Sequence, residues 1–286
     1  MLGTIALGGA ALWSAKTDGV VAEVALVPEI PAPLVQVRCF GAEQTFAFHT
    51  GSTLCFVDES MQPQLGDPLG ESELRAAVGS VKKSMYRAPD ILLGGIRLRG
   101  QWAAYRELTP LAEAMGHPVT GIVGVDAVEK HVVELDLVGE RLRLLSRVPP
   151  QVVEQNERLD MRRTDRGWFV TAKVADSLPV EFMLNTGTNR GITLSQPIFD
   201  RLWAAGAVKD CVETEILSMT GTNVSRDGEL QRITLGRFQH DDLAVSRIDT
   251  CTLGCEYLRR YIIVFDFPRK HLYLRPSTEC DKPQPK

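Results

Sequence analysis

Short apolar stretches, broken by glycine and proline, run along the whole chain. Residues 20–27 are almost entirely apolar, residues 34–40 alternate between apolar and polar side chains, and residues 45–48 form a further apolar run. Alternation and short runs of this kind are typical of β-strands. Pro28 ends the first stretch, and Gly41 begins a turn between the next two. The pattern predicts a mainly β protein.

Two stretches have the character of short helices. They are residues 108–115 (LTPLAEAM) and residues 197–205 (PIFDRLWAA). Residues 58–77 are polar and contain several prolines and glycines, which favours a loop with one short helix. The polar residues 78–86 are compatible with β structure, so we expect a solvent-facing hairpin there.

Two similar motifs occur far apart in the chain. Residues 46–52 read FAFHTGS and residues 182–188 read FMLNTGT. In each motif an apolar run ends in a polar residue, which is followed by Thr-Gly and a small hydroxyl residue. Because glycine lets the backbone turn where a Cβ atom would clash, each motif predicts a buried strand that delivers one polar side chain to a tight loop.

Further landmarks repeat at nearly the same spacing. The matched pairs are His49 with Asn185, Gly124 with Gly254 and Asp136 with Asp266, at offsets of 136, 130 and 130 residues. A repeat of this length predicts an internal duplication that forms two homologous lobes, since solenoid repeats are much shorter.

The duplication divides the chain into five parts. They are an N-terminal segment (residues 1–32), a first lobe (residues 33–147), a linker (residues 148–160), a second lobe (residues 161–276) and a tail (residues 277–286) that we expect to be disordered. The linker is placed at Pro149 and Pro150 and the polar residues after them.

Composition and charge exclude several classes of protein. The 286 residues are 44% hydrophobic and 24% charged, as in a soluble globular protein, and the net charge is −4. There is no basic run with interleaved aromatic residues, so nucleic acid is not an expected partner. The six cysteines lack zinc-finger spacing, and no metal or other cofactor is expected. Disulfides in an exported protein and buried thiols are the two interpretations left open.

The first fifteen residues are apolar and uncharged. They resemble the hydrophobic region of a signal peptide but lack the positive residues that precede it, and they are too short to span a bilayer. Export to a periplasmic or extracellular location is one interpretation. An N-terminal strand or a truncated start is the other.

Taken together, these motifs resemble the aspartic proteases of the retropepsin-like and pepsin-like families, with both lobes in one chain. In that family each lobe has a strand that runs into Asp-Thr-Gly, a flap hairpin over the cleft, and a hydrophobic-hydrophobic-Gly segment behind the loop. The corresponding segments here are residues 122–124 (IVG) and 252–254 (TLG), and the flaps would lie at residues 79–86 and near Gly221. The resemblance implies two β-barrel lobes, paired within a monomer, with a peptide-binding cleft between them.

The chain departs from the family at the catalytic positions, where His49 and Asn185 replace both aspartates. Two neighbouring carboxylates share one proton and so supply an acid and a base, whereas an amide supplies neither. His49 alone would lack its acid partner. The resemblance therefore implies an inactive homologue that binds an extended peptide or protein segment. The residues implied to contact it are Thr50, Gly51, Ser52, Gly79, Tyr86, Thr186, Gly187, Thr188 and Gly221.

Two alternatives remain open from the residues. One is an active endopeptidase that uses His49 or a displaced carboxylate, for which Asp58 and Asp126 are the candidates. The other is a structural or assembly module whose cleft is filled by its own chain, with the segment before Pro33 as the expected occupant.

Overall fold

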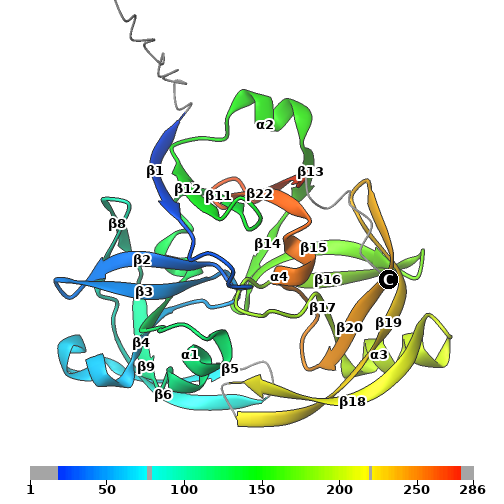
Figure 1. Ribbon diagram of the computed structural model, residues 1–286, viewed down its shortest axis with the longest axis horizontal. Coiled ribbons are helices and arrows are strands. Elements are labelled where there is room, and N and C mark those ends of the chain that lie inside the picture. Colours follow the sequence, from blue (N-terminus) through cyan, green and yellow to red (C-terminus); the bar gives the residue numbers. More distant parts are fainter. Residues whose placement is uncertain (1–18, 76–78, 219–220, 278–286) are drawn as a thin grey trace, which may run out of the picture.

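The computed structural model describes residues 19–75, 79–218 and 221–277, and it confirms a mainly β protein. The signal-like segment and nearly all of the C-terminal tail lie outside the described residues. Three sheets are arranged around the centre of the molecule, with a nine-stranded sheet on the left of Figure 1, an eight-stranded sheet on the right and a six-stranded sheet at the top.

The nine-stranded sheet is formed by the first half of the chain, in the order β5-β6-β9-β4-β10-β3-β2-β7-β8. Its strands are β2 (Leu34–Cys39), β3 (Ala42–His49), β4 (Cys55–Asp58), β5 (Gly70–Arg75), β6 (Ser80–Arg87), β7 (Asp90–Leu93), β8 (Ile96–Arg99), β9 (Trp102–Arg106) and β10 (Gly121–Gly124). Strand β10 runs parallel to β3 and antiparallel to β4, so it lies between the strands before and after the first Thr-Gly loop.

The eight-stranded sheet is formed by the second half, in the order β14-β15-β16-β21-β17-β20-β19-β18. Its strands are β14 (Arg162–Thr164), β15 (Gly167–Val174), β16 (Leu178–Leu184), β17 (Ile192–Ser195), β18 (Val208–Ser218), β19 (Gly221–Leu235), β20 (Phe238–Ile248) and β21 (Thr252–Leu253). Strand β21 runs parallel to β16 and antiparallel to β17, which is the same pairing as in the first half. The sequence repeat thus has a counterpart in the strand pairing.

The six-stranded sheet combines both halves in the order β1-β12-β11-β22-β23-β13. Its strands are β1 (Val20–Ala25), β11 (Val132–Asp136), β12 (Arg141–Leu145), β13 (Glu157–Asp160), β22 (Tyr261–Asp266) and β23 (His271–Pro276). The halves meet where β11 pairs antiparallel with β22, from Val132 opposite Asp266 to Asp136 opposite Ile262.

Short helices connect these sheets. They are the α-helices α1 (Thr109–Met115), α2 (Pro150–Gln155), α3 (Gln196–Ala204) and α4 (Cys255–Leu258), and the 3-10 helices η1 (Glu59–Leu65) and η2 (Val125–Ala127). The predicted helices at residues 108–115 and 197–205 correspond to α1 and α3. No helix within the described ranges combines the length and the apolar character needed to cross a bilayer.

Two regions have more regular structure than the sequence pattern suggested. Residues 58–77, expected to be a loop with one short helix, contain η1 and also strand β5, which pairs with β6. The expected linker, residues 148–160, contains α2 and strand β13, whose pairing with β23 places it at the edge of the six-stranded sheet.

The core of the nine-stranded sheet is divided between its two faces. Phe46, Phe48, Cys55, Val57 and Val123 belong to the main hydrophobic cluster, which extends through the rest of the molecule. The residues that alternate with them, Ala47, Leu54, Phe56 and Ile122, belong to a second cluster together with Leu108 and Met115 at the ends of α1. Helix α1 therefore covers the second face of this sheet, which we call the α1 face.

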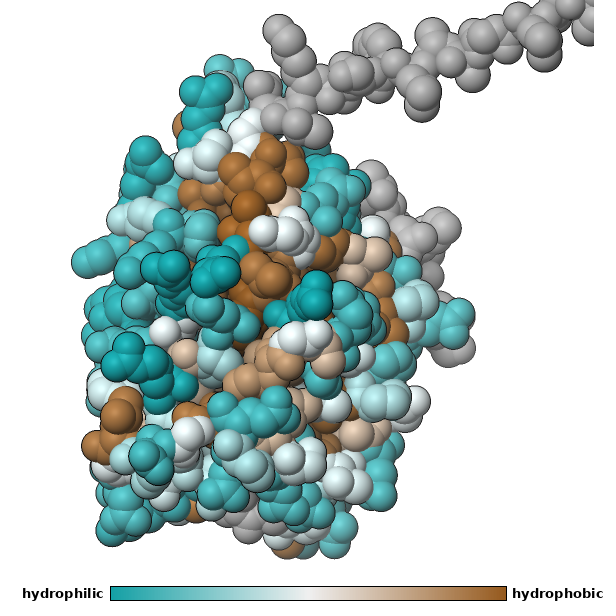
Figure 2. Space-filling view, turned by 90° about the vertical axis from the view of Figure 1, so that its left-hand side faces the viewer, coloured by the Kyte–Doolittle hydropathy of each residue, from teal (hydrophilic) through white to brown (hydrophobic). Residues whose placement is uncertain are grey.

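The surface is mostly hydrophilic on the side formed by the first half. Figure 2 shows this side, with one group of hydrophobic residues in its upper half and hydrophilic residues around it. Val21 in β1 is an exposed hydrophobic residue, at 43% exposure. The five cysteines in the described ranges, Cys39, Cys55, Cys211, Cys251 and Cys255, are free thiols, which favours the buried-thiol interpretation for the four that are buried.

Candidate functional site

The two polar residues of the Thr-Gly motifs meet at the centre of the molecule. His49 is the last residue of β3, and Asn185 directly follows β16. The Nε2 atom of His49 lies 2.8 Å from Oδ1 of Asn185. Because Oδ1 of Asn185 also accepts the backbone N–H of Gly187 at 3.0 Å, it is the acceptor toward His49, and Nε2 of His49 carries the proton.

The threonines of the two motifs bind each other reciprocally. The backbone N–H of Thr50 donates to Oγ1 of Thr186 at 3.0 Å, and the backbone N–H of Thr186 donates to Oγ1 of Thr50 at 3.1 Å. Each hydroxyl then donates onward to the opposite strand, from Thr50 to the carbonyl of Leu184 at 2.8 Å and from Thr186 to that of Phe48 at 2.6 Å. Both threonines are fully buried, so these bonds fix the two loops to each other.

The glycines of the motifs allow the loops to approach closely. A Cβ atom on Gly51 would lie 2.5 Å from Oδ1 of Asn185, and one on Gly187 would lie 2.2 Å from Nε2 of His49. Each polar side chain thus occupies the space above the glycine of the opposite loop. The sequence motif predicted glycine at these positions because of a tight turn. The structure shows a second reason, since only glycine leaves room for the polar side chain of the other half.

The hydrophobic-hydrophobic-Gly segments support the loops from behind. The backbone N–H of Val125 donates to the carbonyl of Ser52 at 2.8 Å, and that of Cys255 donates to the carbonyl of Thr188 at 2.9 Å. The glycine before each donor is packed against backbone, because a Cβ atom on Gly124 would lie 2.2 Å from the carbonyl oxygen of Leu54. The equivalent distance at Gly254, to the carbonyl oxygen of Arg190, is 2.1 Å.

The His49 ring is neutral over a wide pH range. Burial lowers the pKa of His49 to about 4, the hydrogen bond to Asn185 opposes this shift, and the positive charge of Arg106 adds to it. With Nε2 protonated and bonded to Asn185, the unprotonated nitrogen is Nδ1. The pair is therefore an uncharged hydrogen bond above about pH 4.

The two candidate displaced carboxylates have structural partners elsewhere. Asp58 accepts the backbone N–H of Ser60 at 3.1 Å and that of Leu108 at 3.0 Å, so it caps η1 and anchors the start of α1. Asp126 accepts the backbone N–H of Gln101 at 2.8 Å. In the described part of the chain, neither carboxylate has a hydrogen bond with His49 or Asn185.

Helix α1 and the residues around it cover the part of the α1 face next to His49. Ala47, Leu54, Phe56 and Ile122 are each no more than 6% exposed, because residues of α1 and the segment around it pack over them. The structure thus covers this face with α1 and the segment around it. Ala32 and Ile30 do contribute to the same cluster.

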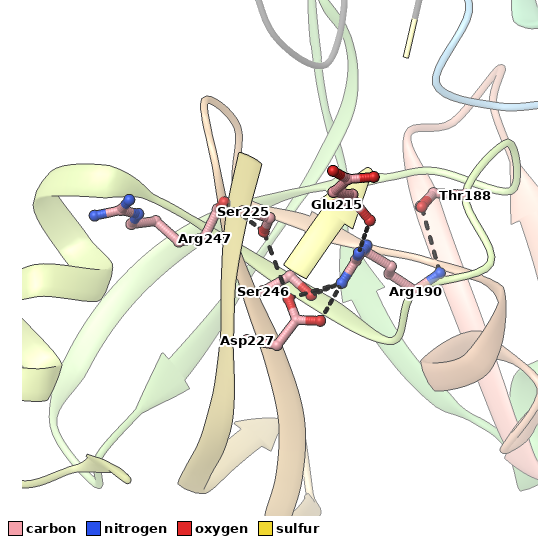
Figure 3. Close-up of polar contacts among 7 residues, drawn as sticks. All are labelled: Thr188, Arg190, Glu215, Ser225, Asp227, Ser246 and Arg247. Atoms are coloured by element: carbon pink, nitrogen blue, oxygen red, sulfur yellow. Dashed lines mark hydrogen bonds and ion pairs between the residues drawn. The ribbon is translucent and has the colours of Figure 1, made fainter. Parts of the chain in front are cut away.

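The second half has a polar cluster in the corresponding region, which the sequence pattern did not predict. One guanidinium nitrogen of Arg190 donates to both carboxylate oxygens of Asp227 at 2.7 Å and to Oγ of Ser246 at 2.5 Å (Figure 3). Its other terminal nitrogen donates to the carbonyl of Glu215 at 3.3 Å. The position of Arg190, two residues after Thr188, was the available signal.

The remaining predicted contact residues lie in different surroundings. Ser52 donates to the carbonyl of Leu54 at 2.7 Å, and Oγ1 of Thr188 accepts the backbone N–H of Arg190 at 3.3 Å, so both hydroxyls stabilise their own loops. Gly79 donates its backbone N–H to the Asp249 carboxylate of the other half at 3.1 Å. Gly221 is the first residue of β19 and pairs with Ser218.

Tyr86 does not have the exposed position that the sequence suggested. Its side chain is 3% exposed, and its ring lies 6.0 Å from that of Tyr105, centroid to centroid. Tyr86 stands opposite Ala103 of β9, near the base of the β5–β6 hairpin and not at its tip. Because the side chain packs inward, little of it is free to contact a ligand.

Other candidate sites are sparse. Within the described residues there is no group of three or more His, Cys, Asp and Glu side chains that could hold a metal ion. A shallow hollow of about 280 Å³ is lined by Phe40, Leu92 and Arg97. It lies near β7 and β8, at the edge of the nine-stranded sheet opposite β5. Neither protein-family models nor curated proteins match this chain. The central loops are therefore the candidate functional site.

Proposed function

We propose that this protein is a catalytically inactive homologue of the retropepsin-like aspartic proteases, with one lobe in each half of the chain, and that it acts as a binding scaffold. The hydrogen bond between His49 and Asn185 is the observation that carries the proposal. It lies between two equivalent loops, at the positions where a protease of this class has its carboxylate pair. The reciprocal bonds of Thr50 and Thr186 keep those loops together without the acids.

The chemistry of the pair explains the expected lack of peptidase activity. Amide hydrolysis on this scaffold needs one group to take a proton from water and another to protonate the carbonyl oxygen of the substrate. Asn185 has no titratable proton, and Nε2–H of His49 is already bonded to Oδ1 of Asn185. Asp58 and Asp126 are held by backbone N–H groups, so they do not substitute for the missing acids.

The proposed ligand is an extended peptide or protein segment that lies between the two halves. The N–H of Gly79 already bonds to Asp249 across the halves, so the β5–β6 hairpin contacts the second half. The polar cluster of Arg190, Asp227 and Ser246 gives the second half a set of part-buried polar groups, whereas the apolar α1 face is already covered. Binding to backbone groups and polar side chains is thus favoured over binding in apolar pockets.

Peptidase assays test the absence of catalysis. We expect no cleavage of a mixed peptide library between pH 3 and pH 8 by the wild-type protein. The same assay with the double variant His49→Asp and Asn185→Asp asks whether the acids are the missing part. Pepstatin-sensitive cleavage by the wild type that disappears in His49→Ala would contradict the proposal.

Peptide capture tests the binding role. The immobilised protein is incubated with the library, and retained peptides are identified by mass spectrometry. The control is the Asn185→Trp variant, in which a large side chain displaces the central pair and whose folding is verified by circular dichroism. We expect the wild type to retain a subset of peptides that the variant loses.

A second candidate function is supported by α1. Since this helix already buries the apolar face beside His49, the protein would serve as a structural module that needs no ligand. Under this alternative the wild type and Asn185→Trp retain the same peptides or none, so the capture experiment separates the two functions.

A further inference from the structure

Arg106 is a charged residue on the α1 face, beside the central pair. It is the last residue of β9, where Ala104 belongs to the α1-face cluster and Ala103 to the main core. Because side chains alternate along a strand, Arg106 lies on the same face as Ala104. His49 lies on that face too, by the same alternation from Ala47 in β3.

The carboxylate best placed to neutralise Arg106 is used elsewhere. Asp58 stands opposite Arg106 in the parallel pairing of β4 with β9. Its two oxygens bind Ser60 and the backbone N–H of Leu108, and it forms no ion pair with Arg106. Arg106 has no carboxylate partner among the described residues, although its side chain is half-buried.

Several other half-buried arginines of the protein do have such partners. Arg143 pairs with Glu23 and Glu134, and Arg190 pairs with Asp227. Burial lowers the pKa of Arg106, and no neighbouring anion offsets this. A half-buried charge without a partner is less well solvated than a fully exposed one, so a ligand that supplies the counter-charge would stabilise it.

The surroundings of Arg106 also suit an anion. His49 is within electrostatic reach of Arg106, since the arginine charge contributes to lowering the histidine pKa. The neutral ring neither repels nor neutralises the guanidinium, and Asn185 is uncharged. An arginine guanidinium presents a planar set of donors that matches a carboxylate.

We propose that Arg106 binds a carboxylate of the ligand on the face that it shares with His49. The carboxylate belongs to an acidic side chain of a peptide or to its free C-terminus. This inference rests on the proposed peptide-binding function and specifies its substrate class, because a peptide without a carboxylate at this position would leave Arg106 unpaired.

Three peptide libraries distinguish the sources of the carboxylate. One is acetylated, amidated and fixed as Glu at one position, the second is identical but fixed as Gln, and the third carries Gln with a free C-terminal carboxylate. Affinities are measured by fluorescence polarisation for wild type, Arg106→Gln, Arg106→Lys and the control Arg99→Gln, which changes an exposed arginine of β8.

We expect the wild type and Arg99→Gln to bind at least one carboxylate library about tenfold to a hundredfold more tightly than the Gln library, as for hydrogen bonds to charged groups. Arg106→Gln should lose this preference, and Arg106→Lys should keep part of it. Equal binding of all three libraries to the wild type, or a preference that survives in Arg106→Gln, overturns the carboxylate site but leaves the peptide-binding function standing. Absence of any binding to the wild type overturns both.

The melting temperature provides a second, independent readout. If Arg106 is held ready for a ligand, Arg106→Gln removes an uncompensated half-buried charge and should raise the melting temperature of the free protein. A lower melting temperature for Arg106→Gln, with Arg99→Gln unchanged, would assign Arg106 a structural role and overturn the proposal.

Discussion

At the scale of single residues, the central site depends on the lack of side chains at two glycines. His49 occupies the space above Gly187, and Asn185 occupies the space above Gly51. The hydrogen bond between the two polar side chains requires both spaces. At interior positions with so little room, one added methyl group lowers the stability of the folded protein.

The variant Gly187→Ala tests this packing. Its Cβ atom would lie 2.2 Å from Nε2 of His49, so the imidazole must move and its bond to Asn185 must break. We expect a loss of about 1–3 kcal/mol in the free energy of unfolding, measured by chemical denaturation. The matched control is Gly191→Ala, where the nearest atom would be 3.6 Å away and little change is expected. Equal effects of the two variants would contradict the argument.

The neutral His49 ring makes a second prediction at this scale. Its pKa is about 4 in the folded protein and near the ordinary 6.5 in the unfolded chain. As the pH falls below about 6.5, the unfolded state binds a proton at His49 that the folded state does not bind. The free energy of unfolding therefore decreases progressively between about pH 6.5 and about pH 4.

The difference between wild type and His49→Gln isolates this contribution, because His240 also has its pKa lowered to about 4 by burial. Chemical denaturation at pH 7 and pH 4.5 should show that the wild type loses more stability on acidification than His49→Gln does. An NMR titration midpoint of the His49 ring near 6.5 would contradict the prediction.

At the scale of the elements, the link between β3 and β16 is formed by the two threonines that follow them. Thr186 satisfies both the backbone N–H of Thr50 and the carbonyl of Phe48, and Thr50 does the same for Thr186 and Leu184. Valine has the same shape as threonine but offers no such bonds. The exchange therefore leaves buried backbone groups without partners.

We expect Thr50→Val and Thr186→Val each to lower the free energy of unfolding, by about 1–3 kcal/mol for every backbone group left unpaired. The double variant should cost less than the sum, because the two side chains belong to one network. Thr53→Val, in the first loop, is the control. Additive effects, measured by chemical denaturation, would show that the two threonines act independently.

The first strand of the β5–β6 hairpin illustrates what the sequence pattern missed. Strand β5 (GESELR) contains Gly70 and two glutamates, which are poor strand formers, and it lies at the edge of its sheet. Its pairing with β6 includes an exposed ion pair between Glu71 and Lys82. Tertiary pairing, rather than local preference, makes this segment a strand.

At the scale of the whole molecule, the two halves share a sheet as well as the central loops. Strand β11 from the first half pairs over five residues with β22 from the second. Leu135, Leu142, Ile263 and Phe265 from this sheet are buried in the main hydrophobic cluster. Neither half on its own can complete this sheet or the bonds between the threonines.

Expression of residues 1–147 alone tests this dependence. We expect the fragment to lack cooperative unfolding or to self-associate, since the edge of β11 and the hydrophobic residues beside it are exposed. Coexpression with residues 148–286 should yield a 1:1 complex that unfolds cooperatively. A monomeric first half that unfolds cooperatively in denaturant, shown by sedimentation and circular dichroism, would contradict this view.

The sequence by itself determined the β character, the two Thr-Gly loops, the positions of α1 and α3, and the equivalence of His49 with Asn185. These features follow from local periodicity and from a repeat, both of which can be read along one chain. Only the tertiary structure decided that His49 donates to Asn185, that Tyr86 is buried, that α1 covers the apolar face, and that Arg190 pairs with Asp227. Each of these depends on contacts between segments far apart in the sequence, and no local preference encodes which side chains will meet.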